Sequence, residues 1–209
     1  MSEPWDSVDH PAMPAIGVIG WFHIVRRGVP LILLIAVCLA LLLIVRLIEA
    51  PIWKAKRPIT PFITQFVCKN AFYIMGIRHE VQGTVMRGPG AVVANHVSWL
   101  DIFALNATKR IYFVSKSEVA KWPGIGWLAR ATGTVFIQRD RKSAKTQVSV
   151  FRERLKAGHK LLFFPEGTST DGLQVLGFKP TLFAAFFDDV LRETMRIQPV
   201  TVKYIPDES

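Results

Sequence analysis

The first long hydrophobic run of the chain extends from Pro30 to Val45 and contains no charged residue. A helix that crosses a bilayer needs about 20 apolar residues, so this run is at the lower limit of length. Leu47 and Ile48 would extend it, because the intervening Arg46 can snorkel toward the interface. A cleaved signal peptide is disfavoured, since the run starts late and no small-residue cleavage site follows it. The pattern therefore predicts a membrane-anchoring helix.

A second hydrophobic segment runs from Ile59 to Ile77, with its apolar residues at roughly helical spacing. This pattern predicts an amphipathic helix that lies in the membrane interface or packs on the rest of the chain. Three basic residues at 54–57 precede it, and the positive-inside rule places such a cluster on the cytoplasmic side. The pair Arg26–Arg27 on the other flank leaves a hairpin dipping into one leaflet as the alternative. We expect a polar tail and pre-membrane segment at 1–28 and a hydrophobic two-helix anchor at 29–77.

From Arg78 onward, short apolar runs alternate with longer amphipathic segments. The strand candidates are His79–Gln82, Ala91–Ala94, Ile111–Ser115, Thr134–Gln138, Leu161–Phe164 and Arg196–Ile205. The helix candidates are Trp99–Ala107, Glu118–Ala131, Ser143–Ala157 and Pro180–Val190. Such alternation is typical of α/β proteins, so we predict that residues 78–209 form an α/β domain with a central mixed sheet and flanking helices.

Composition narrows the choice of partners. Half of the 209 residues are hydrophobic and the formal net charge is +10, while the mean hydropathy is +0.28. An excess of positive charge suggests an anionic partner, either nucleic acid or an anionic membrane surface. The apolar bias favours the lipid membrane. The sequence has no zinc-finger spacing, basic heptad region or RNA-binding aromatic signature, so we expect no nucleic-acid partner.

The two cysteines give no sign of a disulfide, because Cys38 lies in the apolar run and Cys68 in a predicted helix. This usage fits a reducing compartment. No metal-binding spacing such as H-E-x-x-H is present. We therefore expect neither a metal nor a cofactor.

The stretch Asn95–Asp101 carries the first candidate chemistry, and it follows an apolar run that reads as a buried strand. Ser98 can cap the helix that comes next, which places His96 at the strand end and Asp101 in the first turn of the helix. In that geometry the carboxylate of Asp101 could hold one imidazole nitrogen and leave the other free as a base. From these residues alone, a loop histidine beside a helix-starting aspartate is an equal alternative.

Two more strand ends carry polar residues. The apolar strand candidate at 134–138 is followed directly by Arg139, whose planar guanidinium suits phosphate or carboxylate. Taken alone, a charged turn explains Arg139 better. The buried strand that ends at Phe164 is followed by 165–169, which hold a proline, a glutamate, a glycine and two hydroxyls. Ligands of open α/β sheets bind outside the carboxyl ends of strands, and a simple turn does not explain a glutamate at this place.

Two remaining features carry less information. The stretch Ile197–Val200 starts the last strand with a proline, which by itself indicates nothing. Ser98 and Ser169 could be read as hydrolase nucleophiles. Neither serine lies in a G-x-S-x-G pattern, so a serine nucleophile is disfavoured.

Together and in this order, these four stretches resemble the motifs of the glycerolipid acyltransferase family, of the lysophosphatidate acyltransferase type. The first motif, N-H-x-S-x-x-D, matches residues 95–101, and the second, a strand that reaches an arginine, matches 133–139. The third, F-P-E-G-T, matches 164–168, and the fourth, a short apolar stretch with proline, matches 197–200. The resemblance covers about residues 78–205, and the first and third motifs in one chain at this separation are quite specific.

The resemblance implies acyl transfer from a thioester to the free hydroxyl of a lysolipid, at a membrane. It implies that His96 is the general base and that Asp101 orients it. The acyl donor is acyl-CoA or acyl carrier protein, and we expect the cytoplasmic face of a bacterial inner membrane as the location. The family also carries a hydrophobic two-helix segment, which 30–77 matches. The candidate substrate-binding residues are Asn95, Ser98, Arg139, Glu166, Gly167, Thr168, Ser169 and Lys179.

One departure from the family pattern concerns Ser169. Lysophosphatidate enzymes usually read F-P-E-G-T-R-S, and this chain has no arginine at that place. Either Arg139 and Lys179 compensate for it, or the acceptor lacks a phosphomonoester. We therefore predict a lyso-aminolipid acceptor such as lyso-ornithine lipid, with 1-acylglycerol-3-phosphate as the alternative. A non-catalytic, membrane-anchored lipid-binding module is the alternative of another class, although binding alone does not call for a histidine base.

Overall fold

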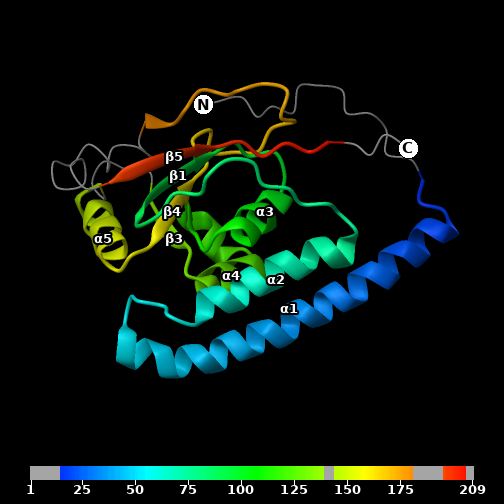
Figure 1. The fold of residues 1–209 in the computed structure, drawn as a ribbon, viewed down its shortest axis with the longest axis horizontal. Helices are drawn as coiled ribbons and strands as arrows, with labels where there is room; N and C mark the ends of the chain where they lie inside the picture. The colour runs from blue at the N-terminus through cyan, green and yellow to red at the C-terminus, as the bar shows by residue number, and fades with distance from the viewer. Residues whose placement is uncertain (1–14, 139–143, 181–194, 206–209) are drawn as a thin grey trace.

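The computed structural model describes residues 15–138, 144–180 and 195–205. Its helices are α1 (Val18–Trp53), α2 (Thr60–Met75), α3 (Leu100–Thr108), α4 (Ile125–Thr132) and α5 (Ala144–Lys156), with a short 3₁₀ helix η1 at Ser117–Lys121. Its strands are β1 (Gly90–Ala94), β2 (Tyr112–Lys116), β3 (Val135–Ile137), β4 (Lys160–Phe163) and β5 (Arg196–Val200). Figure 1 shows the sheet with α5 beside it, while α1 runs along the outer edge of the molecule with α2 next to it.

The five described strands form one sheet in the order β3-β2-β4-β1-β5. The α/β class is confirmed, but every described ladder is parallel, where we predicted a mixed sheet. The reason lies in the connections. The chain passes from β1 to β2 through α3, from β2 to β3 through α4, and from β3 to β4 through α5. Each helix returns the chain to the edge where the previous strand began, and such crossovers join parallel strands.

Two layers of core fill the two faces of the sheet. Because side chains alternate along a strand, Leu161 and Phe163 face one side of β4 while Leu162 faces the other. The first face packs against Phe151 of α5, and the second against Leu105 of α3. All three β4 side chains are fully buried. Full burial of one such side chain stabilises the fold by about 1.5–3 kcal/mol, so β4 contributes strongly to the stability of the sheet.

The helix α1 is 36 residues long and contains Pro30 and Pro51. It begins at Val18, so residues 18–28, which we assigned to a pre-membrane segment, continue the same helix. Among the described helices, only α1 is long and apolar enough to cross a membrane. Its length of about 54 Å exceeds the hydrocarbon thickness of a bilayer, and most of its apolar side chains are exposed.

Charged residues of α1 hold both ends of α2. The carboxylate of Glu49, only 1% exposed, accepts hydrogen bonds from the backbone N–H groups of Ile59 and Thr60 at 2.7 and 3.1 Å and from the Thr60 hydroxyl at 2.7 Å. At the other end, Arg27 Nη1 donates to the carbonyl of Met75 at 2.7 Å. Backbone groups at helix ends lack partners within the helix, and α1 supplies partners at both ends of α2.

Three predicted elements differ from the structure. Residues 79–82 form no strand. Just beyond them, the side chain of Gln198 accepts the N–H of Met86 and donates to the carbonyl of Thr84. The predicted helix 118–131 is divided into η1 and α4 at Gly124, whose φ of 69° does not fit a helix. The last strand ends at Val200. The predicted helix 180–190 lies almost entirely outside the described residues.

Candidate active site

The imidazole of His96 lies just beyond the carboxyl end of β1. Its Nδ1 is 2.8 Å from Oδ2 of Asp101, in the first turn of α3. Its ring stacks on Phe164, with the ring centroids 4.0 Å apart and the planes at 12°. Phe164 follows β4, which pairs in parallel with β1, so both residues leave the sheet at the same edge. The carboxylate and the phenyl ring together fix the position and the tilt of the imidazole.

Asp101 is completely buried and accepts hydrogen bonds at both carboxylate oxygens. Besides His96, its Oδ2 accepts the backbone N–H groups of Val97 at 2.7 Å and Ser98 at 3.0 Å. Its Oδ1 accepts the Tyr204 hydroxyl at 2.6 Å. Burial alone would raise the pKa of the Asp101 carboxyl, but these hydrogen bonds outweigh burial and the pKa is lowered. The carboxylate therefore stays ionised at neutral pH.

The carboxylate determines which imidazole nitrogen is available for chemistry. An ionised carboxylate accepts hydrogen bonds only, so the proton of a neutral imidazole lies on Nδ1. The lone pair is then on Nε2, which has no hydrogen-bond partner among the described residues. The His96 side chain is 22% exposed, which leaves it reachable from outside. The arrangement can accept a proton at Nε2 and can stabilise the imidazolium that results.

The loop that follows β4 borders the histidine. The backbone N–H of Thr170 donates to the carbonyl of His96 at 2.9 Å, and the backbone N–H of Lys179 donates to Pro165 at 2.9 Å. The carboxylate of Glu166 is buried and accepts the N–H of Leu176 at 3.0 Å. Glu166 therefore connects the start of this loop to Leu176 near its end.

The other loop candidates lie toward the outside. Gly167 has a φ of 72°, a conformation that glycine adopts without strain. Thr168 is exposed and Ser169 half-buried. The structure thus brings the first and third motifs together.

Two predicted binding residues have local partners. The side-chain amide of Asn95 donates to the carbonyl of Val202 at 2.9 Å and accepts its N–H at 2.7 Å. This geometry makes Asn95 a support for the chain after β5, and the predicted contact of Asn95 with substrate stays a prediction. Ser98 Oγ accepts the N–H of Leu100 at 3.3 Å, but the N-cap of α3 is Trp99, one residue after the predicted capping residue. Arg139 lies outside the described residues.

Sequence reasoning missed Tyr204 as a member of the site. A signal for it exists in the strand register, in which Ala94 of β1 lies opposite Val200 of β5. Continued by four residues, this register places Tyr204 opposite Ser98, next to the start of α3. The signal required the parallel pairing of β1 with β5, which no local pattern reveals.

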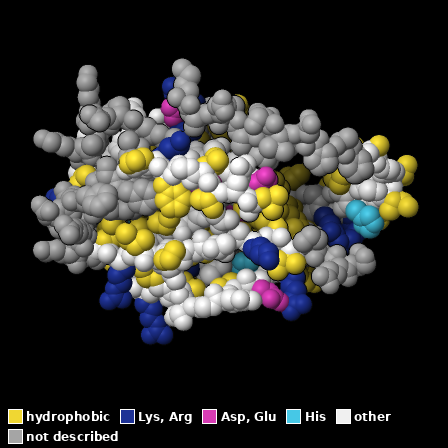
Figure 2. All heavy atoms as spheres, turned by 90° about the horizontal axis from the view of Figure 1, so that it is seen from above, with side chains coloured by type: hydrophobic (Ala, Val, Ile, Leu, Met, Phe, Trp, Pro, Cys, Tyr) yellow, Lys and Arg dark blue, Asp and Glu magenta, His cyan; other side chains and the backbone are white. Residues whose placement is uncertain are grey.

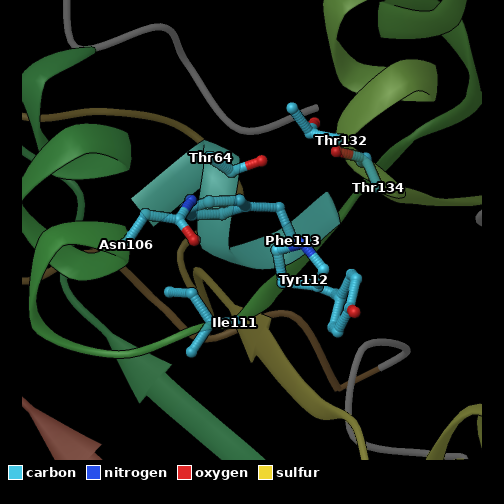
Figure 3. Close-up of a pocket in the computed structure, with 8 residues that line it drawn as sticks. Thr64, Asn106, Ile111, Tyr112, Phe113, Thr132 and Thr134 are labelled. Carbon is cyan, nitrogen blue, oxygen red and sulfur yellow. The ribbon is translucent and has the colours of Figure 1, made fainter. Parts of the chain in front are cut away.

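Hydrophobic side chains are exposed on the face that carries this loop and β5 (Figure 2). They include Leu173, which is 91% exposed, as well as Val175 and Ile197. A small pocket elsewhere lies between α2, α3 and β2, as Figure 3 shows, and its lining includes Thr64, Asn106 and the ring of Tyr112. Because Tyr112 begins β2, this pocket lies at the opposite ends of the strands from His96. Its lining contains neither His96 nor Asp101.

Residues 77–203 match the model of the Acyltransferase family, and the chain belongs to that family. The chain is similar to the lyso-ornithine lipid O-acyltransferase of Rhodobacter capsulatus, with 59% identity over 182 residues, which are 87% of this chain and 66% of the relative. It is 34% identical over 180 residues to the enzyme of the same name from Rhizobium meliloti, covering 81% of this chain and 61% of that one.

A third relative bears a different name. The 1-acyl-sn-glycerol-3-phosphate acyltransferase of Neisseria gonorrhoeae is 38% identical over 123 residues, which are 57% of this chain and 48% of the relative. The chain therefore spans about half to two thirds of the length of these relatives.

Proposed function

We propose that this protein is a membrane-bound lysolipid O-acyltransferase, which moves a fatty acyl group from a thioester to the free hydroxyl of a lysolipid. The observation that carries the proposal is the hydrogen bond of 2.8 Å between His96 Nδ1 and the buried carboxylate of Asp101. A lipid-binding module would gain nothing from an oriented imidazole with a free second nitrogen. General-base catalysis requires both features.

In the proposed mechanism, Nε2 of His96 takes the proton of the acceptor hydroxyl as its oxygen attacks the thioester carbonyl. The new C–O bond forms and the carbonyl electrons move to its oxygen. When the carbonyl re-forms, the C–S bond breaks and the thiolate leaves with the proton from the imidazolium. Asp101 stabilises the imidazolium in between. No covalent intermediate with the enzyme is needed, and the donor is an acyl thioester in either form, acyl-CoA or acyl carrier protein.

The membrane attachment is supported by α1, which is long and apolar enough to cross a bilayer and exposes most of its apolar side chains. The basic residues at 54–57 directly follow the end of α1. By the positive-inside rule this end of the helix faces the cytoplasm. We therefore propose the cytoplasmic face of a bacterial inner membrane as the location of the protein.

For the acceptor, we propose a lyso-aminolipid of the lyso-ornithine lipid type. Ser169 stands where phosphate-reading relatives carry arginine, and a phosphomonoester with its charge of about −1.5 to −2 needs matched cations. Two relatives named lyso-ornithine lipid O-acyltransferases, at 59% and 34% identity, support this choice. The second candidate acceptor is 1-acylglycerol-3-phosphate, favoured by the relative from Neisseria gonorrhoeae at 38% identity.

The test of the catalytic proposal is acyl transfer by purified protein in lipid vesicles, with lyso-ornithine lipid and an acyl thioester as substrates. His96→Ala should lower turnover by about 10²- to 10⁴-fold and leave folding and membrane attachment unchanged. His23→Ala makes the same change at an exposed histidine of α1 and should behave like the wild type. A folded His96→Ala protein with near-normal turnover would exclude the mechanism. Binding of lysolipid by the wild type without any turnover would support the lipid-binding module.

The acceptor proposal is tested separately with Ser169→Arg. The kcat/KM values for lyso-ornithine lipid and 1-acylglycerol-3-phosphate are compared with one donor, in the wild type and the variant. We expect the arginine to shift the ratio toward the phosphate acceptor by about tenfold, which is roughly 1.4 kcal/mol. Thr168→Arg adds the same charge at the exposed neighbouring position and should shift the ratio less. A wild type that already prefers the phosphate acceptor by about tenfold would show that the missing arginine does not decide the acceptor.

A further inference from the structure

We propose that Tyr204 is a positioning residue of the acyl-transfer site, whose hydroxyl holds the Asp101 carboxylate in the orientation that His96 requires. The inference rests on the proposed function of the His96–Asp101 pair. Tyr204 lies outside the four motifs and directly beyond residues 77–203, which match the family model. Its role is therefore read from the geometry of this chain.

The first argument is the hydrogen-bond count at Asp101. Its Oδ2 accepts three donors, namely the imidazole and two backbone N–H groups. Its Oδ1 accepts the Tyr204 hydroxyl at 2.6 Å and has no other hydrogen-bond donor among the described residues. Asp101 is completely buried, and a buried carboxylate oxygen without a partner is strongly unfavourable. With the Tyr204 hydroxyl, both oxygens of the buried Asp101 carboxylate accept hydrogen bonds, which stabilise its negative charge.

The second argument is how the chain delivers Tyr204. The ladder with β1 ends at Val200, and the following segment is held by the side chain of Asn95, which binds both backbone groups of Val202. Tyr204 comes two residues later, so in an extended chain its side chain points to the same side as that of Val202. Val202 packs against the buried residues of α3 and β1. The asparagine of the first motif therefore places the tyrosine at the start of α3.

The third argument is the chemical state of the hydroxyl. Burial has the largest effect on the pKa of Tyr204 and raises it. The hydrogen bond to Asp101 and the negative charge of Asp101 raise it further, so the pKa lies well above its usual value, although a hydrogen bond with Ser98 acts in the opposite direction. The hydroxyl therefore keeps its proton throughout the working pH range and remains a donor. A permanent donor on Oδ1 prevents rotation of the carboxylate and withdraws charge from it. Both effects set how strongly Asp101 holds the imidazolium.

Removal of the hydroxyl then has a defined consequence. In Tyr204→Phe the ring stays, but Oδ1 of Asp101 loses its hydrogen-bond donor. More of the negative charge of the carboxylate is then available to His96, while the carboxylate orients the imidazole less firmly. The base should retain its proton to higher pH, and the rise of activity with pH should move upward. A residue with a merely structural role would lower the amount of active enzyme without moving this profile.

The experiment compares the wild type, Tyr204→Phe and Tyr73→Phe in lipid vesicles from pH 5 to 9. Tyr73 lies on α2 and is 87% exposed, so the same change there is the control. For Tyr204→Phe we expect kcat to fall about tenfold, KM for the lysolipid to stay within about twofold, and the midpoint of the acidic limb to rise by roughly half a pH unit or more. Tyr73→Phe should retain the wild-type values of all three.

Asn95→Ser serves as the second variant, because it releases the Tyr204 segment without touching Asp101. It should cause the same upward shift, and the double variant should lose little more than either single one. A wild-type kcat and pH profile for folded Tyr204→Phe, together with an inactive His96→Ala, would overturn the role of Tyr204 alone. Should Tyr204→Phe fail to fold, an unshifted profile of Asn95→Ser would overturn it. An active His96→Ala would instead overturn the proposed function on which it rests.

Discussion

Replacement of Asp101 by asparagine should lower kcat by about two orders of magnitude and preserve the fold. The asparagine can be accommodated because its amide oxygen can take the place of Oδ2 and accept the N–H groups of Val97 and Ser98. Its NH₂ group then faces the Tyr204 hydroxyl, which can also act as an acceptor. The shape and the hydrogen bonds are kept, and the negative charge is lost.

The size of the effect follows from the distance. The imidazolium nitrogen and the carboxylate oxygen are 2.8 Å apart, and opposite charges at about 4 Å between their centres attract by about 4 kcal/mol at an effective dielectric constant near 20. A neutral hydrogen bond in the same place retains about 1 kcal/mol. The remaining difference of about 3 kcal/mol applies to the transition state, where the imidazolium forms, and corresponds to about a hundredfold in rate.

The assay is turnover with saturating acyl thioester and lysolipid in vesicles, alongside the melting temperature of each variant. Asp171→Asn is the matched control, because it makes the same change at an exposed aspartate of the loop after β4, whose carboxylate accepts the N–H of Leu173. It should retain wild-type kcat. If folded Asp101→Asn keeps kcat within about threefold of the wild type, the carboxylate does not stabilise the imidazolium and the electrostatic reasoning fails.

Three further predictions concern stability and attachment. Burial, and after it the charges of nearby arginines, lower the pKa of His159 from 6.5 to about 3. Between these two pH values, only the unfolded chain binds a proton at His159. The contribution of this histidine to the free energy of unfolding is therefore fully present above about pH 6.5 and declines as the pH falls. The melting temperature should drop by roughly 5 °C or more from pH 7.5 to 4.5, and by clearly less in His159→Phe; equal drops would refute this cause. A Cβ on Gly126 would lie 2.3 Å from the carbonyl oxygen of Ala120, so Gly126→Ala should lower the melting temperature by roughly 5 °C, whereas Gly177→Ala, with open space around it, should not. The protein should remain in the membrane pellet after high-salt and carbonate washes; release by salt alone would mean that its basic surface provides the attachment.

The parts of this molecule that depend on neighbouring residues could be predicted from sequence. The apolar run before Asn95 and the helix after it gave β1 and α3 within one residue of their observed starts. The boundary made the contact of His96 with Asp101 one of two equal alternatives, because both residues lie within one strand-to-helix turn, and the structure shows the contact. Local chemistry of this kind needs no knowledge of which strands are neighbours.

The parts that depend on distant residues could not be predicted. Tyr204 and Asp101 are far apart in the chain, and only the parallel pairing of β1 with β5 brings them together. Glu166 follows a strand end, which suggested substrate binding, and no local pattern indicated that its carboxylate also accepts the backbone N–H of Leu176 within the same loop. The start of α1 was placed too late because the apolar run was delimited by the charges of Arg26 and Arg27, whereas the helix continues through both residues and through Pro30.

The contacts that α1 makes with both ends of α2 have a consequence for the polarity of the molecule. A negative side chain is favourable at a helix N-terminus and a positive one at a C-terminus, and α1 offers Glu49 to the first and Arg27 to the second. If α2 ran in the opposite direction, its negative C-terminus would face Glu49 and its positive N-terminus would face Arg27. The two charges of α1 therefore favour one direction of α2 over the other. Since α2 packs on α3 through Cys68 and Phe72, and α3 carries Asp101, these two charges of the first helix also bear on how the His96–Asp101 pair is oriented relative to α1.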